Sequence, residues 1–441
     1  SRRRTRKSLT NEPHLLSVVK FLFVSPEALS LDLAYRIVQE GHEVKFCVQS
    51  ETEKDVGDGF VEKADRWEDH VSWAEVIVFD DIGFGRAADK LRAEGKKVVG
   101  GSAYTDRLES DREFGQNELA RAGVSILQSR TFSDFEEAIK FVQANPSRYV
   151  IKPSGKAQND KELLFVGQEA DGNDVINVLA HYKKHWSSKI RVFQIQQFAS
   201  GVEVAVGAFF NGKDFVKPIN VNFEHKRLFP GDIGPSTGEM GSLIFWTHQS
   251  SIFGLTLEKM KQQLVESGYV GYIDINCIAN GTAIYPLEFT SRFGYPTISI
   301  HMEGVTGEWG RFLHSIAGGE NVALEAKKGF QIGVVIAVPP FPFTDDKTFR
   351  KFSEDATVLF KKPDMAGVHL GEIKKDGSDW RIAGRSGYAL VVTGSGITTE
   401  EARQQAYNRV ANIMIPNMFY RTDIGAKWIK DSDLLLSLGY L

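Results

Sequence analysis

A basic segment followed by a glycine-rich loop is the part of this sequence best suited to chemistry on a small molecule. His225-Lys226-Arg227 leads into a loop over residues 231–241 with the sequence GDIGPSTGEMG. Basic side chains and exposed backbone amides both stabilise anions. The segment and the loop therefore predict a site for a charged small molecule.

Oxygen-bearing side chains follow about fifty residues later. Asp274 and Asn276 alternate with apolar residues and so share one face of an expected strand. Glu288 and Thr290 follow another apolar run, after the turn signal Asn280-Gly281. Carboxylate, amide and hydroxyl oxygens suit hard cations such as Mg²⁺. A solvated sheet face would have the same spacing, so both interpretations stay open at this point.

The elements that must position these residues fall into three units. The first unit, residues 15–104, alternates strands with helices and predicts a small α/β domain with a parallel sheet. Its expected strands are residues 17–24, 43–48, 76–79 and 97–101, with a helix over residues 30–39. The Val-Ile-Phe-rich strands fit burial on both faces.

The middle unit, residues 105–328, is expected to be α+β. Helices are predicted over residues 112–121 and 135–144, and strands over 149–153, 163–166, 202–210, 214–220, 272–278 and 283–289. Asn211-Gly212 and Asn280-Gly281 predict hairpin turns. The last unit, residues 329–441, is predicted to contain strands over 332–338 and 388–393 and a helix over 398–414.

Composition limits the possible functions. The 441 residues are 42% hydrophobic and 25% charged with a net charge of -4, which argues against nucleic acid as the principal partner. Two cysteines in apolar runs give neither a disulfide framework nor a zinc spacing and favour a cytoplasmic protein. No apolar run is long enough to span a membrane. The basic arm at residues 1–14 is expected to be disordered, with anion binding as the alternative.

Several segments, in order along the chain, resemble the phosphoribosylamine–glycine ligase family of the ATP-grasp superfamily. The most specific is His225-Lys226-Arg227 with the GPSTGEMG loop, which is similar to the family's HKR and GPNTGGMG signature. The others are residues 150–152, 196–203, 288–294 and 421–425. The resemblance implies a Rossmann-like N-terminal domain, a two-lobed ATP-grasp core and a C-terminal α+β domain.

The resemblance also implies an ATP-dependent ligation of a carboxylate to an amine through an acyl phosphate. It places ATP against Arg112, Lys152, Lys161, Gln196, Phe198 and Glu203. It places substrate against His225, Lys226, Arg227, Pro235, Ser236, Thr237, Gly238 and Arg292, with Lys152 and Arg292 as catalytic residues. The expected ligands of Mg²⁺ or Mn²⁺ are Glu288, Asp274, Asn276 and Thr290.

Departures from the family pattern concentrate on the substrate side. The family's glycine-rich turn after the first strand, which holds a phosphate, is here Ser25-Pro26-Glu27, and Glu239 stands where the family has glycine. Three hypotheses follow: a related ligase with an altered substrate, an authentic phosphoribosylamine–glycine ligase of purine biosynthesis, and a non-catalytic nucleotide-binding protein. The expected partners are a small carboxylate, such as glycine or another amino acid, and an amine. The assembly is expected to be a monomer or a homodimer.

Overall fold

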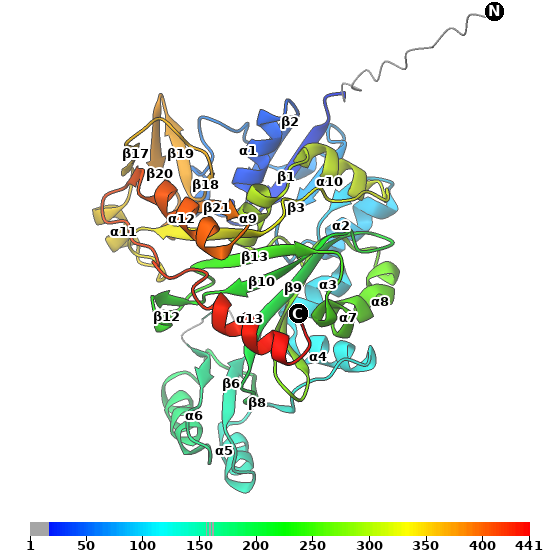
Figure 1. Ribbon diagram of the computed structural model, residues 1–441, viewed down its shortest axis with the longest axis vertical. Helices are drawn as coiled ribbons and strands as arrows, with labels where there is room; N and C mark the ends of the chain where they lie inside the picture. Colours follow the sequence, from blue (N-terminus) through cyan, green and yellow to red (C-terminus); the bar gives the residue numbers. More distant parts are fainter. Residues whose placement is uncertain (1–16, 156, 158–159, 161–162) are drawn as a thin grey trace, which may run out of the picture.

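The computed structural model describes residues 17–155, 157, 160 and 163–441. The basic arm expected over residues 1–14, and Lys161, lie outside the described residues. The described strands form one eight-stranded sheet, three four-stranded sheets and a two-stranded hairpin (Figure 1).

The N-terminal unit has a parallel sheet, as predicted, and its strand order is β2-β1-β3-β4. The strands and helices of this unit are β1 (Lys20–Ser25), α1 (Leu31–Gln39), β2 (Glu43–Val48), β3 (Val76–Phe79), α2 (Gly85–Ala93) and β4 (Lys97–Val99), with 3₁₀ turns at Glu51–Glu53 and Trp67–His70. Phe21 and Phe23 of β1 are fully buried. They share one apolar cluster with Leu313 and Ile316 of α10 (Trp309–Ala317), so a helix from the middle of the chain completes this core.

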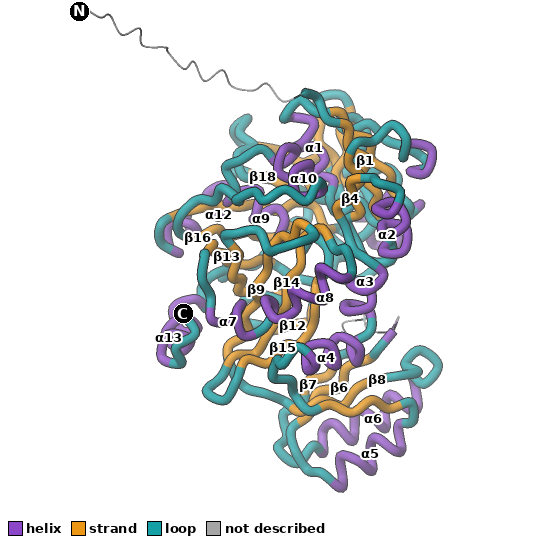
Figure 2. The backbone as a smooth tube through the Cα atoms, turned by 90° about the vertical axis from the view of Figure 1, so that its right-hand side faces the viewer, coloured by secondary structure: helices purple, strands orange, loops and turns teal. Residues whose placement is uncertain are grey.

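A small lobe lies at one end of the molecule, at the bottom of Figures 1 and 2. Its antiparallel sheet has the order β5-β8-β6-β7. The lobe contains β5 (Ser129–Phe132), α5 (Phe135–Ala144), β6 (Tyr149–Pro153), β7 (Phe165–Val166), α6 (Asn173–His185) and β8 (Phe193–Gln197). Apolar side chains of α5 and α6 pack on the sheet around Phe193 and Ile195.

The helices predicted over residues 112–121 and 135–144 are confirmed as α4 (Arg112–Arg121) and α5.

The central sheet is antiparallel, in the order β15-β14-β9-β10-β13-β16-β21-β18. Its strands are β9 (Val202–Asn211), β10 (Ile219–Glu224), β13 (Gly241–Thr247), β14 (Val270–Ala279), β15 (Ile284–Thr290), β16 (Phe330–Ala337), β18 (Val368–Leu370) and β21 (Tyr388–Gly396). The strands β16 and β21 come from the last unit of the chain. The expected boundary near residue 328 therefore lies between strands of one continuous sheet.

The remaining elements surround this sheet. They are α3 (Ala103–Ser110), β11 (Arg227–Phe229), β12 (Ile233–Ser236), α7 (Ser251–Leu255), a 3₁₀ turn (Leu257–Met260), α8 (Lys261–Glu266), α9 (Thr297–Gly304), α11 (Asp346–Phe352), β17 (Thr357–Phe360), β19 (Ile373–Asp376), β20 (Asp379–Ile382), α12 (Thr399–Val410), β22 (Ile413–Met414) and α13 (Trp428–Ser437). No helix in the described part of the chain is both long and apolar enough to cross a membrane.

Two sequence-based predictions of elements are wrong. The strand expected over residues 214–220 is instead a turn in which the Asn211 side chain accepts from the Lys213 and Asp214 amides, and β10 begins only after Pro218. The helix expected over residues 398–414 ends at Val410. The Asn412 side chain bonds the backbone of Lys362 and Asp364, which draws the chain into β22.

The central sheet has one apolar and one polar face. Residues such as Val206, Val221 and Ile275 point into the main apolar core. The opposite face carries two cross-strand rows, Asn220-Gly207-Asp274-Thr290 and Asn222-Ala205-Asn276-Glu288. Gly207 is required in the first row, because a Cβ there would lie 2.1 Å from the Tyr272 hydroxyl. Strand alternation thus gathers polar groups on one surface.

Candidate active site

Two neighbouring cavities open on the polar face of the central sheet. The larger, of about 400 Å³, lies between this sheet and the small lobe. The smaller, of about 270 Å³, is lined mainly by residues of β14, of β15 and of the segment that follows β15. The two cavities share the lining residues Arg112, Glu224, Lys226, Gly238 and Glu288. A molecule that fills the larger cavity therefore meets a molecule in the smaller one at these shared residues.

The larger cavity combines an apolar slot with charged groups. The slot is lined by Leu127, Val150, Leu164, Val166, Ile278 and Leu287. The cavity also brings together the predicted residues Arg112 of α4, Lys152 of β6, Gln196 of β8, Phe198 directly after β8, and Glu203 of β9. A flat apolar slot with polar groups at its rim suits an aromatic base attached to an anionic chain.

Lys152 is a buried cation at the end of β6, with a side chain on the larger cavity. Burial, together with the nearby positive charges of Arg112 and Lys226, lowers its pKa to about 7. Glu288 and Glu203 oppose this effect. A lysine with such a lowered pKa is suited to bind phosphate, because a nearby anion favours the protonated, positively charged form of the amine.

The four predicted metal ligands are cross-strand neighbours on β14 and β15. Asn276 lies opposite Glu288, and Asp274 lies opposite Thr290. The Asn276 amide donates to Glu224 Oε2 at 3.0 Å, whereas its buried Oδ1 has no hydrogen-bond partner. Within the described residues, no group of three or more His, Cys, Asp or Glu side chains is arranged to hold a metal ion. A cation here would need further oxygen atoms from a bound phosphate.

Lys226 joins three carboxylates at the boundary between the cavities. Its Nζ lies 2.9 Å from Glu203, 3.5 Å from Glu224 and 3.4 Å from Glu288. Burial opposes its charge, but these carboxylates raise the pKa of Lys226 well above its usual range. Lys226 therefore lines both cavities, and its positive charge offsets the negative charge of the three carboxylates.

Some of the other predicted residues between His225 and Gly238 line the larger cavity, and others are outside its lining. Arg227, Ser236, Thr237 and Gly238 line the larger cavity. His225 is fully buried and, like Pro235, lines neither cavity. Burial and the charges of Lys427 and Arg421 lower the pKa of His225 to about 4, so its ring is neutral. His225 and Pro235, which the resemblance places against substrate, therefore lie apart from the linings of both cavities.

Arg292 lines the smaller cavity but is held by the protein's own carboxylates. It lies 3.3 Å from Asp81 and 3.1 Å from Glu109, both from the N-terminal half of the chain. Burial opposes its charge, yet Glu109 and Asp81 raise the pKa of the guanidinium. A substrate anion must therefore compete with two carboxylates for Arg292.

Three carboxylates of the site, Glu224, Glu109 and Asp81, were not predicted from the sequence. The sequence pattern could have indicated Glu224 as a site residue, because Glu224 alternates with Asn220 and Asn222 along one strand and directly precedes His225. No local sequence pattern indicates Glu109 or Asp81, since tertiary packing alone brings them to Arg292.

The turn after β1 is closed by a carboxyl group of the protein. Asp80 is fully buried and accepts from the Ser30 amide at 3.0 Å and the Ser30 hydroxyl at 2.6 Å, at the start of α1. Burial raises the pKa of Asp80 to about 7, and the Ser30 hydrogen bonds oppose this rise. The helix start, which commonly binds a phosphate, here binds Asp80.

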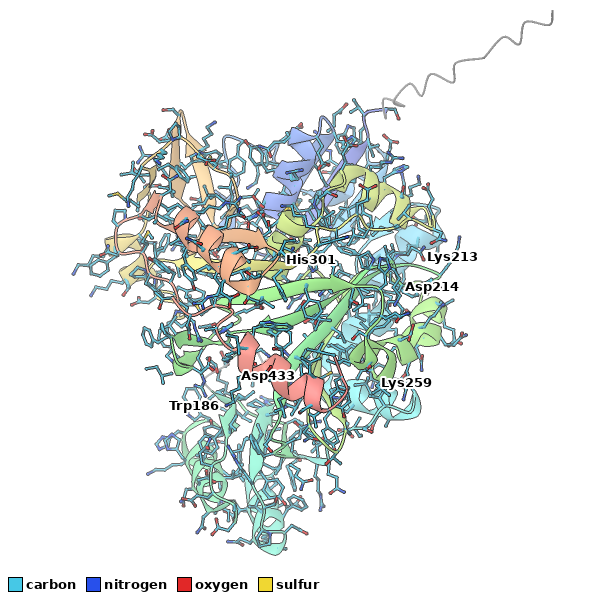
Figure 3. All side chains as sticks on the ribbon, viewed as in Figure 1. Trp186, Lys213, Asp214, Lys259, His301 and Asp433 are labelled. Atoms are coloured by element: carbon cyan, nitrogen blue, oxygen red, sulfur yellow. The ribbon has the colours of Figure 1, made fainter. Side chains whose placement is uncertain are left out.

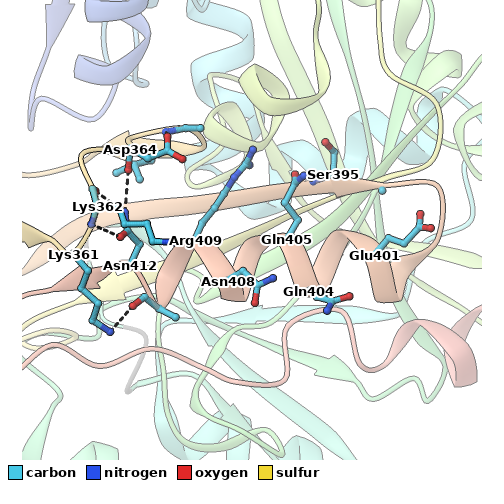
Figure 4. Close-up of a pocket in the computed structure, with 14 residues that line it drawn as sticks. Lys361, Lys362, Asp364, Ser395, Glu401, Gln404, Gln405, Asn408, Arg409 and Asn412 are labelled. Carbon is cyan, nitrogen blue, oxygen red and sulfur yellow. Dashed lines mark hydrogen bonds between the residues drawn. The ribbon is translucent and has the colours of Figure 1, made fainter.

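A further cavity of about 730 Å³ lies beside α12, away from these residues (Figure 4). The ammonium group of Lys361, on its lining, donates to the Ala411 carbonyl at 2.6 Å. The predicted site residues are absent from its lining.

A base-sized slot between a small antiparallel sheet and a larger one, with Lys152 and Glu288 beside it, defines an ATP-grasp protein. Residues 110–298 match the family model of the phosphoribosylglycinamide synthetase ATP-grasp (A) domain, and residues 331–427 match that of the C domain. The chain belongs to this family of ATP-dependent ligases, which form carbon–nitrogen bonds.

A curated relative is similar to this chain in sequence, and two solved structures are similar to it in fold. Phosphoribosylamine–glycine ligase of Streptococcus pneumoniae is 27% identical over 372 residues, which cover 82% of this chain and 85% of the relative. The crystal structure of phosphoribosylamine–glycine ligase from Thermotoga maritima superposes with a TM-score of 0.67 at 21% identity, covering 92% of this chain and 100% of that chain. The biotin carboxylase domain of 2-oxoglutarate carboxylase from Hydrogenobacter thermophilus gives 0.62 at 13% identity, covering 92% of each chain.

The low pKa of Lys152 predicts a pH-dependent affinity for ATP. Above pH 7 the free lysine loses its charge, so phosphate binding must restore the proton. We expect the Kd for ATP to rise by about tenfold or more between pH 6.5 and 8.5. Isothermal titration calorimetry across this range measures the effect. Lys152→Arg, which stays charged, should flatten the dependence, and an equally steep profile in this variant would contradict the role of Lys152.

Proposed function

We propose that this protein is an ATP-dependent carboxylate–amine ligase that forms an acyl phosphate and acts on a pair of substrates other than phosphoribosylamine and glycine. The ligase part of the proposal is supported by family membership and by the convergence of Lys152, Glu203 and Glu288 on one cavity. The altered substrate is supported chiefly by Asp80, because a carboxyl group binds the start of α1 where a phosphate would otherwise bind.

The proposed reaction has two steps. A carboxylate oxygen attacks the γ-phosphorus of ATP, the bond from that phosphorus to the β,γ-bridging oxygen breaks, and ADP leaves. The neutral amine then attacks the acyl carbon, a carbon–nitrogen bond forms, and the carbon–oxygen bond to phosphate breaks. The proton lost by nitrogen leaves on the released phosphate. This chemistry requires alignment and charge stabilisation but no covalent enzyme nucleophile.

The proposed roles follow from the positions of the side chains. Lys152 and Arg112 bind the phosphates, the slot beside Gln196 and Phe198 holds the base, and Glu203 accepts from the ribose hydroxyls. Arg292, on the smaller cavity, orients the substrate carboxylate toward the γ-phosphate. The predicted nucleotide contact of Lys161 concerns a residue outside the described part of the chain.

Glu288 and Asn276 fit a divalent cation, because a carboxylate and a buried amide oxygen without a partner lie opposite each other. They would hold Mg²⁺ or Mn²⁺, with Asp274 and Thr290 in the neighbouring row, and the cation would neutralise phosphate charge.

Two alternatives have specific support. Authentic phosphoribosylamine–glycine ligase activity in purine biosynthesis is favoured by the His225-Lys226-Arg227 segment and by the curated relatives. A non-catalytic nucleotide-binding protein is favoured if Glu288, which contacts Lys226 and Arg112, serves only as their counter-ion.

Measurement of ADP release over a matrix of acids and amines separates these hypotheses. Glycine with phosphoribosylamine should give little ADP, whereas another pair should give ADP that depends on both components. Activity with glycine and phosphoribosylamine alone would replace our proposal with the first alternative. A rate of ADP release that is unchanged by any acid or amine would contradict the proposal that the protein is a ligase.

A further inference from the structure

We propose that Arg421 is a positioning residue of the larger cavity: together with Asp423 it holds the hairpin β11–β12 in place, and the affinity for ATP depends on this contact. The inference rests on the proposed function, which places ATP in this cavity. It gives a role to residues 421–425, a segment that carries part of the family resemblance but lies outside the linings of both cavities.

The hairpin β11–β12 is largely exposed. Of residues 227–236, all of which the structure describes, Leu228 alone is buried. Phe229 and Ile233 are cross-strand neighbours with 46% and 63% of their surface exposed. A two-stranded hairpin is only marginally stable in water by itself, so this one needs an anchor elsewhere in the chain.

Arg421, which lies between β22 and α13, provides this anchor from the last unit of the chain. Its Nη1 donates to the Arg227 carbonyl and to Asp232 Oδ1, each at 2.9 Å. Asp423 accepts from the Gly231 amide at 3.0 Å. The last unit therefore bonds both the first strand and the turn of the hairpin.

The Arg421 side chain is itself fixed in direction. It is fully buried, and Asp423 accepts from its Nε at 2.8 Å and from its Nη2 at 2.7 Å. The Tyr407 hydroxyl on α12 donates to the Arg421 carbonyl at 2.8 Å. Because two parallel bonds to one carboxylate orient a guanidinium group, Arg421 offers the hairpin a rigid point of attachment.

The hairpin forms part of the wall of the larger cavity, and β12 lies between the central sheet and the small lobe (Figure 1). Five lining residues belong to the hairpin or directly follow it: Arg227, Asp232, Ser236, Thr237 and Gly238. Lys427, also on the lining, forms an ion pair with Asp232. A shift of the hairpin would therefore move several groups of the cavity wall together.

Release of the hairpin should weaken nucleotide binding more than it slows the chemistry. A wall that is free to move must be ordered when the nucleotide binds, and this loss of entropy subtracts from the free energy of binding. Lys152 and Arg112, proposed to bind the phosphates, lie on β6 and α4 rather than on the hairpin. The effect should therefore appear in the KM for ATP and only slightly in kcat.

Calorimetry of the full-length protein with Mg²⁺ and a non-hydrolysable ATP analogue tests the inference. Asp232→Gly removes the carboxylate that contacts Arg421, and glycine suits the positive φ of 57° at this position. Asp423→Asn removes the charge that holds Arg421, at a residue that lines neither cavity. We expect each variant to raise the Kd for the analogue and the KM for ATP by about tenfold, with kcat within about twofold of the wild type.

Arg421 itself is unsuited to a first test, because its removal would leave two carboxylates without their cation. Asp433→Asn is the matched control, since Asp433 is an exposed residue of α13 in the same unit (Figure 3). The control should leave Kd and KM unchanged, and thermal unfolding verifies that every variant is folded.

Hydrogen exchange gives a second readout that needs no variant. The analogue should slow exchange over residues 229–236 in the wild type, because the bound nucleotide meets the wall that the hairpin forms. Without the analogue, these residues should exchange faster in Asp232→Gly and in Asp423→Asn than in the wild type.

Four results would overturn the inference. They are an unchanged Kd and KM in both variants, a fall in kcat at constant KM, an equal rise of Kd in the Asp433 control, and no protection of the hairpin by the analogue. A rise of Kd in Asp232→Gly alone would also overturn it, because this result would indicate direct contact between Asp232 and the nucleotide.

The inference and the proposed function can fail separately. Weaker binding of the analogue in both variants, with no acid and amine that promote ADP release, would support the positioning role and contradict the ligase. ADP release that depends on an acid and an amine, with the same KM for ATP in the wild type and both variants, would support the ligase and overturn the positioning role.

Discussion

Replacement of Glu288 by glutamine is expected to lower kcat by about a thousandfold or more while the protein stays folded. Glu288 lies on the wall shared by the two cavities, opposite Asn276 and next to the cations Lys226 and Arg112. Glutamine keeps the size of the side chain but removes the charge that would hold a divalent cation at the phosphates. The loss should appear mainly in kcat, because charge develops on the phosphates during transfer.

Steady-state ADP release with the active pair of substrates measures this effect. Glu308→Gln, an exposed residue before α10, is the matched control and should retain full activity. A fall in kcat of less than about tenfold in Glu288→Gln would contradict the proposed role of Glu288.

Replacement of Lys226 by methionine is expected to affect both stability and activity. The variant leaves Glu203, Glu224 and Glu288 close together without their shared counter-ion. We expect the free energy of unfolding to fall by about 2 kcal/mol at neutral pH, less than for a fully buried pair because Lys226 is partly exposed. We also expect kcat to fall by about a hundredfold or more.

The stability loss should depend on pH in a defined direction. Burial raises the pKa of Glu224, and Lys226 opposes this rise. Without Lys226, burial and repulsion from Glu203 and Glu288 raise the folded-state pKa of Glu224 further above its unfolded value. Stability is then retained at low pH, where Glu224 is protonated, and lost as pH rises through its folded-state pKa. Denaturant unfolding at pH 5 and pH 8 tests this, with Lys226→Arg as the charge-retaining control. Equal losses at both pH values would contradict the role of Lys226 as a counter-ion.

Much of the fold could be predicted because local patterns determine it. The strands β2 and β3 and the helices α4 and α5 have the predicted bounds, since alternation and amphipathic spacing act over a few residues. The shared face of Asp274 and Asn276 also followed from strand alternation. The continuation of the central sheet into β16 and β21 could not be predicted, because pairing between distant strands leaves no local signal.

The structure brings several of the predicted site residues together, whereas the ion pairs around them could not be predicted from the sequence. Arg112, Lys152, Gln196 and Glu203 line one cavity. The pairing of Arg292 with Glu109 depends on α3 lying against β15, which only the folded chain shows. The same holds for Asp80 at the start of α1, a contact between residues fifty positions apart.

Transfer of an ¹⁸O label from the substrate carboxylate to phosphate tests the central claim most directly. The acid that gives the highest ADP release would be labelled in its carboxylate and incubated with ATP and the amine, and the released phosphate analysed by mass spectrometry. An acyl phosphate intermediate predicts one ¹⁸O atom in each phosphate formed. Phosphate without the label, or the absence of any acid that promotes ADP release, would contradict the account.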